Sequence, residues 1–456
     1  RSKAVSGKEE VPDAAKYRDY FAWDEPAAQA PSHRILAMFR GEEEGFLRLS
    51  LRPRNEEQAQ DLLARLFVLN DGPCGREVRA AALDGYGRLL APALETELRN
   101  QLKQRADAES IRVFAENLRQ LLLAPPLGAQ NILAVDPGFR TGCKIVCLNR
   151  EGKLLEYATI NPHAGSDKAR TEAGETLLRL AKKHGAEVAA VGNGTAGRET
   201  EAFIRALPGW SIPVVMVSES GASVYSASEA ARAEFPDLDL TYRGAVSIGR
   251  RLADPLAELV KIDPKSIGVG QYQHDVNQSE LKRCLDDVVV SCVNAVGVDV
   301  NTASASLLGR VSGLNAATAK NIVKYREENG AFTGRRQLLK VPKLGPKAFE
   351  QCAGFLRVPE SRSVLDNTAV HPESYAAAEK LLSLTGHTLT DVRDGKLGDL
   401  NAQIRTYGED RAAADCGVGV PTLRDVAAEL MKPGRDIRDE LPKPILRTDV
   451  LEMKDL

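Results

Sequence analysis

Two short segments of this chain share one pattern of apolar and turn-forming residues. Residues 308–315 read Leu-x-x-Val-x-Gly-Leu-Asn, and residues 338–345, offset by 30 positions, read Leu-x-x-Val-x-Lys-Leu-Gly. A helical pattern follows each segment directly, over 317–328 and over 347–356. Self-similarity at a fixed offset is typical of one supersecondary unit that is used more than once. The repeat therefore predicts two helix–turn–helix hairpins in tandem.

A tight turn of small residues in front of a helix is a suitable place to hold a phosphate. Small residues let a ligand approach the backbone closely, and the first N–H groups of the helix point outward from its positive end. Contacts of this kind grip the nucleic-acid backbone without reading its sequence. We expect Leu314 and Leu344 to be buried anchors of the two turns. The predicted nucleic-acid-binding residues are Gly313, Leu314, Asn315, Lys320, Lys324, Arg335, Arg336, Lys343, Leu344, Gly345 and Lys347.

Each turn departs from the Gly-apolar-Gly form at one position. Asn315 replaces the second glycine of the first turn, and asparagine tolerates a left-handed backbone better than most residues. Lys343 replaces the first glycine of the second turn, which predicts a less open turn there. A further segment, Gly-Val-Gly-Val-Pro at 417–421, also precedes a helical pattern. No basic cluster accompanies it, so we expect it to serve packing.

The positive charge of the chain is concentrated around the repeat. The whole chain has a net charge of −2, which does not indicate a polyanionic partner. Between positions 302 and 357, however, ten Lys or Arg residues stand against three Glu residues, an excess of seven positive charges. Such a local excess attracts phosphates even in a nearly neutral protein. A single turn would be explained more simply as a helical corner with solvated lysines, whereas two copies in a basic segment favour a binding module.

A chain of 456 residues is too long for one ordinary domain. We predict a multidomain, elongated, mainly α-helical protein with one α/β domain. The predicted regions are a helical part with a short strand pair at 1–127, the α/β domain at 128–262, the tandem hairpins at 263–358, and a helical C-terminal region at 359–456. No run of about 18 apolar residues is present, so we expect no membrane partner.

The cysteines and the first residues of the chain bear on its compartment. The seven cysteines are odd in number and scattered, with no Cys-x-x-Cys pair. This usage predicts reduced thiols and no zinc site. The first residues do not form a secretory signal. We expect a cytoplasmic, monomeric protein.

A change of pattern near position 131 predicts the α/β domain. Residues 131–136, 142–148 and 153–160 have the pattern of strands joined by short turns, which predicts an antiparallel meander. Helical patterns then alternate with strands at 187–191 and 213–218. This order predicts a mixed sheet with crossover helices.

Several longer motifs resemble one bacterial family. The stretch 301–354 looks like the tandem helix-hairpin-helix domain that is shared with bacterial DNA-uptake proteins. With the other motifs, it makes the whole chain resemble the Tex family of transcription accessory proteins. These motifs are Pro-Ser-His-Arg at 31–34, Phe-Arg-Gly at 39–41, Asp-Pro-Gly-Phe-Arg-Thr-Gly at 136–142, Ile-Gly-Val-Gly-Gln-Tyr-Gln-His-Asp-Val at 267–276, and Lys-Pro-Gly-Arg-Asp at 432–436.

The resemblance implies binding of RNA and DNA beside the transcription machinery. Members of the family are similar in layout to a eukaryotic elongation factor, and they carry an N-terminal helix-turn-helix region and a C-terminal OB-fold domain that binds RNA. This chain departs from that pattern at both ends, so we expect it to be truncated there. RNA polymerase or ribosome-associated machinery is the protein partner that the resemblance implies.

The motif at 136–142 is similar to the first turn of ribonuclease H-like domains of the YqgF and RuvC type. In active members, carboxylates hold two divalent ions that activate a water and stabilise the leaving oxygen. By position, the catalytic candidates are Asp136, Glu219 and Asp254, and the first two are the candidate metal ligands. Asp136 is equally well explained as a turn-capping residue, and Glu219 as a residue that a helix dipole favours.

Two neighbouring residues argue against an intact nuclease centre. Asn193 stands where a RuvC-type resolvase carries an acid, which lowers the affinity for a metal. Pro255 can start a helix that aims the Asp254 carboxylate elsewhere. We therefore favour a vestigial α/β domain.

The sequence thus favours a transcription accessory factor that binds RNA and DNA through its hairpins, without a required cofactor. Two alternatives stay open. One is a metal-dependent nuclease, which would need Mg²⁺ or Mn²⁺. The other is a protein-interaction scaffold of the transcription machinery, in which the basic hairpins are incidental.

Overall fold

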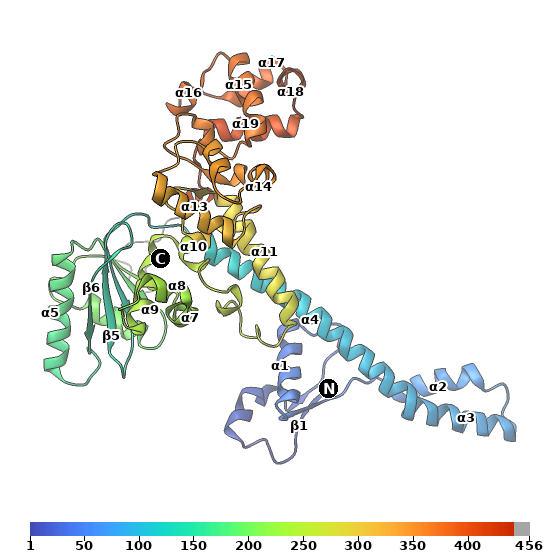
Figure 1. The fold of residues 1–456 in the computed structure, drawn as a ribbon. Coiled ribbons are helices and arrows are strands. Elements are labelled where there is room, and N and C mark those ends of the chain that lie inside the picture. Colours follow the sequence, from blue (N-terminus) through green and yellow to red (C-terminus); the bar gives the residue numbers. More distant parts are fainter. Residues whose placement is uncertain (442–456) are drawn as a thin grey trace. The chain divides into compact units, whose positions relative to one another are not determined.

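The computed structural model describes residues 1–441, and helices predominate in it (Figure 1). The chain forms two compact units, one of Arg1–Asn117 with Gly268–Leu285 and one of Leu118–Ile267 with Asp286–Leu456. The predicted fold class, a multidomain and mainly helical chain with one α/β domain, is confirmed. Residues 442–456 of the predicted C-terminal region lie outside the described residues. Within residues 1–441, no helix has the length and apolar character that crossing a membrane requires.

The first unit combines a small sheet with four helices. Its three strands pair antiparallel in the order β2-β1-β3. A π-helical turn at Tyr86–Leu90 joins the third and fourth helices, beside Pro92, which has no N–H to donate. The elements are β1 (Ser2–Ala4), a 3₁₀ helix (Pro12–Tyr20), β2 (Ala22–Trp23), α1 (Ser32–Glu43), β3 (Leu47–Leu49), α2 (Glu56–Phe67), α3 (Pro73–Gly85) and α4 (Ala91–Leu122).

Residues 268–285 pack with this first unit, although the sequence pattern placed them in the hairpin region. The Asn117 side chain donates a hydrogen bond to the Val269 carbonyl at 2.7 Å. Arg40 bonds the Asp275 carboxylate, with Nε 2.6 Å from Oδ1. Gly270 faces the Phe114 ring so closely that a Cβ atom there would lie 2.0 Å from a ring carbon. These contacts explain the glycine-rich motif at 267–276.

The α/β domain has the predicted strands and topology. Its sheet has the order β6-β5-β4-β7-β8, in which β4, β5 and β6 are antiparallel neighbours and β4, β7 and β8 are parallel. The predicted meander with crossover helices is therefore confirmed. The elements are β4 (Ile132–Asp136), β5 (Cys143–Leu148), β6 (Leu154–Ile160), α5 (Asp167–Lys183), β7 (Val188–Gly192), α6 (Gly197–Arg205), β8 (Val214–Val217), α7 (Ala222–Ala227), α8 (Glu229–Glu234) and α9 (Leu240–Ala253).

Helices cover both faces of this sheet (Figure 1). Side chains of α5 and α6, such as Leu177 and Ile204, form the core on one face. On the other face α9 lies very close to the strands, because a Cβ atom at Gly249 would stand 2.9 Å from the Ala134 Cβ. This close approach brings the start of α9 over the end of β4, where the turn at 136–142 begins with Asp136.

The rest of the second unit is built of the part of α11 that follows Leu285, of shorter helices, and of one pair of short parallel strands. The last five helices share an apolar core that includes Leu381, Leu400 and Leu423. The elements are α10 (Pro255–Leu259), α11 (Gln278–Val296), β9 (Val298–Asp299), α12 (Ala305–Leu308), α13 (Ala316–Asn329), a 3₁₀ helix (Arg335–Lys340), α14 (Pro346–Cys352), β10 (Leu356–Arg357), α15 (Tyr375–Leu384), α16 (Leu389–Arg393), α17 (Leu400–Tyr407), α18 (Glu409–Cys416) and α19 (Val420–Met431).

Candidate nucleic-acid interface

The two repeated turns have the same backbone conformation. The first residue of each turn is left-handed, with φ of 85° at Gly313 and 67° at Lys343. The third residue of each is extended and forms the N-cap of the next helix, with φ and ψ of −131° and 174° at Asn315 and −81° and 174° at Gly345. The second turn is therefore not altered by its lysine. Asn315 stands at its position as a helix cap, and not because it tolerates left-handed backbone.

The two hairpins pack against each other in a reciprocal way. Gly313 in the first turn faces α14 of the second hairpin, where a Cβ atom would lie 2.6 Å from the Gln351 Cβ. In return, the Asn321 amide on α13 donates a hydrogen bond of 2.7 Å to the Pro342 carbonyl in the second turn. The two hairpins are thus one module, which we call the first hairpin pair, residues 302–357.

The two turns differ in how the next helix begins. The Asn315 side chain accepts hydrogen bonds from the N–H groups of Ala317 and Thr318, both at 3.0 Å. These are the groups that a phosphate would otherwise use. At the second turn Gly345 has no side chain, and within the described residues the N–H groups of Lys347 and Ala348 have no acceptor. The second turn is therefore the one that leaves backbone donors available.

Most of the predicted contact residues are exposed. Leu344 is buried as expected, at 3% exposure, whereas Leu314 is only half-buried. Lys324 forms an exposed ion pair with Glu328 at 3.7 Å, which leaves its ammonium group accessible. The exposed predicted residues are Gly313, Asn315, Lys320, Lys324, Arg336, Lys343, Gly345 and Lys347.

Arg335 is the exception, and its assignment as a nucleic-acid contact is wrong. Its side chain is 1% exposed and donates hydrogen bonds to the carbonyls of Leu356, Thr368 and Val370. It also donates to the Tyr375 hydroxyl at 2.8 Å. The sequence showed two adjacent arginines, but the 3₁₀ helix turns the first inward and the second outward. Arg335 therefore joins the first hairpin pair to the helices that follow it.

Two of the three predicted catalytic carboxylates share a pocket in the α/β domain. Asp136, at the end of β4, and Glu219, after β8, line a cavity of about 310 Å³ together with Lys144. The Glu219 side chain lies against the turn after β7, where a Cβ atom at Gly194 would stand 1.5 Å from its Oε1. A side chain at position 194 would therefore displace the Glu219 carboxylate. In addition, the Glu219 N–H donates a hydrogen bond of 3.2 Å to the Asn193 side chain.

The electrostatics of this pocket disfavour the ionised form of Asp136 relative to an exposed aspartate. Burial, together with the nearby charge of Glu219, raises the pKa of Asp136 to about 6, against the opposing effect of Lys144. The buried Oε2 atom of Glu219 accepts no hydrogen bond within the described residues. The two carboxylates thus present acceptor oxygens to the same cavity.

Asp254 does not belong to this pocket, and its assignment as a third catalytic acid is wrong. It follows α9 and caps α10, accepting the Ala257 N–H at 3.1 Å. Its carboxylate also pairs with the guanidinium of Arg438 at 2.8 Å. The α9 residue that approaches Asp136 is Gly244, and ten residues of helix, about 15 Å, separate it from Asp254.

The pocket also lacks other acids. Asn193 follows β7, as the sequence indicated, and contributes an amide instead of a carboxylate. Among residues 1–441, no three His, Cys, Asp or Glu side chains form a group that could hold a metal ion. A two-metal hydrolytic centre would need more ligands than Asp136 and Glu219 supply.

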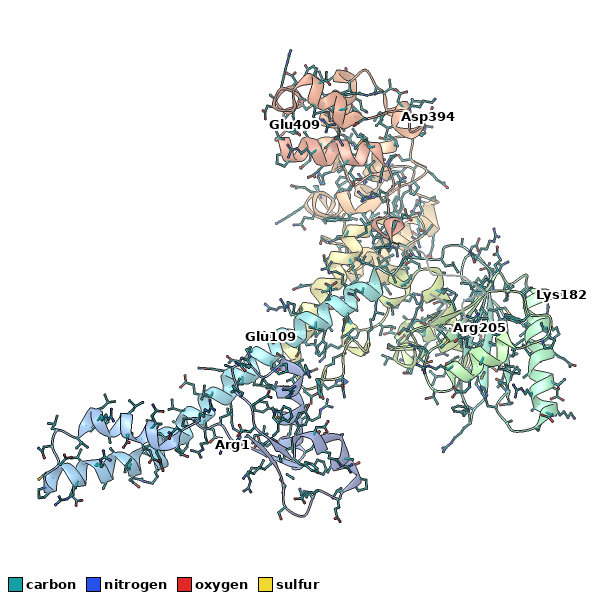
Figure 2. The ribbon with its side chains drawn as sticks, turned by 180° about the vertical axis from the view of Figure 1, so that it is seen from behind. Arg1, Glu109, Lys182, Arg205, Asp394 and Glu409 are labelled. Atoms are coloured by element: carbon teal, nitrogen blue, oxygen red, sulfur yellow. The ribbon has the colours of Figure 1, made fainter. Side chains whose placement is uncertain are left out.

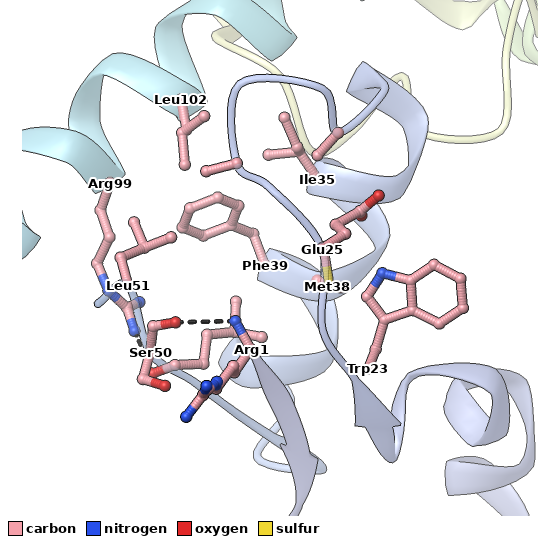
Figure 3. A pocket seen from close by; sticks show the side chains of 13 residues that line it. Arg1, Trp23, Glu25, Ile35, Met38, Phe39, Ser50, Leu51, Arg99 and Leu102 are labelled. Carbon is pink, nitrogen blue, oxygen red and sulfur yellow. Dashed lines mark hydrogen bonds between the residues drawn. The ribbon is translucent and has the colours of Figure 1, made fainter. Parts of the chain in front are cut away.

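A further pocket lies in the first unit, between α1, β3 and α4 (Figure 3). It has a volume of about 50 Å³ and is lined mainly by apolar side chains, such as Ile35, Met38 and Phe39. The α-amino group of Arg1 donates a hydrogen bond of 3.0 Å to the Ser50 carbonyl at its edge (Figure 3). Its small apolar volume suits side-chain packing better than polar chemistry.

Four protein-family models match successive segments of the chain. Residues 1–114 match the Tex central region-like family, and residues 130–253 match the Tex protein YqgF-like domain. A helix-hairpin-helix motif matches residues 293–357, and an HHH domain matches residues 363–438. The chain belongs to the Tex family.

Curated relatives align along the whole of this Tex-family chain. Protein tex of Bordetella pertussis is 49% identical over 100% of the chain and 58% of its own length. Transcriptional accessory protein Tex of Neisseria gonorrhoeae is 46% identical over 100% of the chain and 60% of its own length. The human S1 RNA-binding domain-containing protein 1 is 35% identical, with 100% and 52% covered. The chain thus spans a little more than half the length of these relatives.

The Tex-family chain also contains a second hairpin pair, at residues 375–431, which the sequence reasoning recognised only in part. Gly417, with φ of 70°, and Gly419, the N-cap of α19, repeat the turn geometry of the first pair. Gly386, with φ of 74°, and Thr388, the N-cap of α16, form one more such turn. The offset between Gly386 and Gly417, 31 positions, was the signal that could have revealed it.

The second hairpin pair repeats the capping difference but not the charge of the first. Thr388 caps its own helix through a capping box with Asp391, whereas Gly419, followed by Val420 and Pro421, has no side-chain cap. Nine Asp or Glu residues stand against six Lys or Arg between positions 375 and 431. Asp394 and Glu409, seen in Figure 2, are among these acids. The second pair is thus an acidic copy of a basic module.

Proposed function

We propose that this chain binds RNA and DNA through their phosphate backbones, as part of a transcription accessory factor. The observation that carries the proposal is the second turn of the first hairpin pair. There, the N–H groups of Lys347 and Ala348 have no acceptor in the part of the chain that the structure describes, and Lys343 and Lys347 have exposed side chains. Backbone donors and two exposed lysines therefore belong to the same turn.

The chemistry of this turn suits a phosphate and not a base. N–H groups at the start of a helix and lysine ammonium groups bind the oxygens of a phosphodiester, which every nucleotide carries. Lys320 and Lys324 on α13 extend the positive surface. Binding of this kind tolerates any sequence and weakens steeply with salt.

The names of the relatives support the same proposal. One is a transcriptional accessory protein, and another is named for an S1 RNA-binding domain. We propose that the protein acts in the cytoplasm as a monomer, with RNA polymerase or ribosome-associated machinery as its protein partner. Because the second hairpin pair is acidic, it suits contact with a protein better than contact with a nucleic acid. The scaffold alternative is therefore kept as a secondary function.

Fluorescence anisotropy of labelled single-stranded RNA and duplex DNA, across a salt series, tests the proposal. If four phosphates are engaged, the logarithmic salt slope on duplex DNA is about −3.6, at about −0.9 per contact. We expect the double variant Lys343→Glu/Lys347→Glu to bind at least about tenfold more weakly, with a flatter slope. The matched control is Lys380→Glu/Lys396→Glu, which removes the same charge from the second hairpin pair.

Equal binding by both double variants would contradict the proposal, because the loss would then follow net charge and not position. A nuclease function has less support, since Asp254 pairs with Arg438 and Asn193 replaces an acid. Cleavage that depends on Mg²⁺ or Mn²⁺ and disappears in Asp136→Asn would restore that alternative.

A further inference from the structure

A large polar cavity in the second unit lies apart from both the hairpin turns and the pocket of Asp136. Its volume is about 790 Å³. Its wall includes α10, the β9–β10 strand pair and the segment 434–438. Six cationic side chains line it, namely Arg150, Arg250, Lys261, Arg357, Arg435 and Arg438.

Four of these six cations lie in ion pairs with carboxylates. Arg438 is held between Asp254 and Asp436, at 2.8 Å and 2.7 Å. Arg435 also has an interaction partner. The other paired cations are Arg150 with Glu187 at 2.8 Å, Arg250 with Glu234 at 2.6 Å, and Lys261 with Glu258 at 2.7 Å. The positive charges of the paired side chains are therefore balanced by adjacent carboxylates.

Arg357 forms no ion pair with a carboxylate within residues 1–441. Its side chain is 9% exposed, and Nη1 donates one hydrogen bond of 2.6 Å, to the Gly354 carbonyl. Within the described residues no carboxylate lies within 4.0 Å of it, and its Nε and Nη2 atoms have no acceptor. Asp299 stands opposite Arg357 in the strand register, yet the two form no ion pair. Burial lowers the pKa of Arg357 to about 10, which leaves it charged at neutral pH.

The guanidinium of Arg357 is held in place beside the cavity. Gly297 is left-handed, with φ of 81°, and a Cβ atom there would lie 2.9 Å from the Arg357 Cζ. The guanidinium thus lies directly against the backbone at Gly297. Asn367 lines the same cavity, and its side-chain amide has no hydrogen-bond partner among residues 1–441. A buried cation and an unused amide therefore face one cavity.

We propose that this cavity binds a phosphate group, with Arg357 as its counter-charge and Asn367 as a second donor. A buried unpaired charge is strongly unfavourable, and an oxyanion would remove that penalty. The planar fork of a guanidinium matches phosphate oxygens in a way that a point charge does not. The phosphate can belong to a nucleic acid or to a small phosphorylated molecule. The site is separate from the hairpin turns, so the inference does not rest on the proposed function.

Titration of the 456-residue chain with inorganic phosphate, followed by ³¹P NMR line width and by thermal unfolding, tests the inference. Chloride keeps the ionic strength constant. We expect phosphate to broaden its own resonance and to raise the melting temperature of the protein. Arg357→Gln should lose at least about tenfold in phosphate affinity, as expected for a charge-assisted contact. Arg150→Gln, which removes a paired charge from the same wall, should bind as the parent does.

Each outcome of these experiments either supports or overturns the inference. No broadening with the parent chain, or equal losses in Arg357→Gln and Arg150→Gln, would overturn the inference. If Arg357→Gln does not fold, Arg357→Lys and Asn367→Ala provide the same test, and unchanged affinity in both would overturn it. Competition by a mononucleotide and by a 5′-phosphorylated oligonucleotide then identifies the source of the phosphate. The hairpin variant Lys343→Glu/Lys347→Glu should retain phosphate binding here even if it loses nucleic acid.

Discussion

The first and second hairpin pairs share their turns but not their charge. In both pairs each turn begins with a left-handed residue and ends with an extended N-cap, as at Gly313 and Gly417. The first pair carries seven excess positive charges and the second three excess negative charges. The comparison teaches that the turn geometry is a packing solution. The charge around it decides whether a polyanion can bind.

Within each pair the two hairpins also differ in the same way. The first helix is capped by its own side chain, Asn315 or Thr388, and the second begins at an uncapped glycine, Gly345 or Gly419. A cap uses up the N–H groups that a phosphate would accept from. The second hairpin of the basic pair is therefore the place where geometry and charge coincide.

The largest loss of stability is expected from a substitution of Arg335, which joins the two hairpin pairs. Arg335→Ala would remove a buried guanidinium that bonds Leu356 of the first pair, Thr368 and Val370 between the pairs, and Tyr375 at the start of the second. We expect a loss of about 3–5 kcal/mol in the free energy of unfolding, because the carbonyls of Leu356, Thr368 and Val370 lose their donor in the interior. Urea denaturation measures it. Arg336→Ala, on the exposed side, should change stability by less than about 0.5 kcal/mol, and similar losses in both would refute the role of the buried arginine.

The next largest effect on stability concerns Gly313 and Lys343, which have the same left-handed backbone conformation. Gly313→Ala would place a Cβ 2.6 Å from the Gln351 Cβ in a left-handed residue, so we expect a loss of about 3 kcal/mol. Lys343→Gly should instead raise stability by about 1 kcal/mol, because it relieves the strain of φ 67° in a residue with a side chain. Thermal unfolding measures both changes. Opposite signs are the essential result, and a shared sign would mean that the turns are not equivalent.

Exchanging the caps would sharpen the difference between the two hairpins of the basic pair. Asn315→Ala should cost about 1 kcal/mol in stability, since it removes the acceptor for two N–H groups. Gly345→Asn should add a few tenths of a kcal/mol and lower the affinity for duplex DNA by about threefold, because the new side chain accepts the free N–H groups. Anisotropy and thermal unfolding on the same samples measure both quantities. Unchanged affinity in Gly345→Asn would show that the lysines alone make the contact.

The smallest effect concerns the acidic pair. Neutralising Asp410 and Asp425, both exposed, by Asp410→Asn/Asp425→Asn should raise nucleic-acid affinity by less than about threefold, and only at low salt, because exposed charges are screened beyond about 10 Å. A rise of more than about tenfold would indicate that the second pair binds nucleic acid itself.

The α/β domain shows where prediction from sequence succeeds and where it stops. Strand and helix positions followed from local periodicity, so β4 to β8 lie where the pattern placed them. The grouping of Asp136 with Glu219 also followed, since both stand at carboxyl ends of strands that meet at one edge. The assignment of Asp254 as a catalytic acid failed because its ion-pair partner, Arg438, is 184 positions away in the sequence. No local pattern carries that information.

What the amino-acid sequence determined by itself is the set of local elements, the repeated turns and the distribution of charge. These depend on neighbours a few positions apart, through hydrogen bonding, capping and side-chain periodicity. Only the tertiary structure decided that Arg335 is buried while Arg336 is exposed, that Asp254 pairs with Arg438, and that Arg357 lines a cavity without an ion pair among the described residues. Each of these depends on which distant segments share a wall, because desolvation and charge pairing act through space and not along the chain.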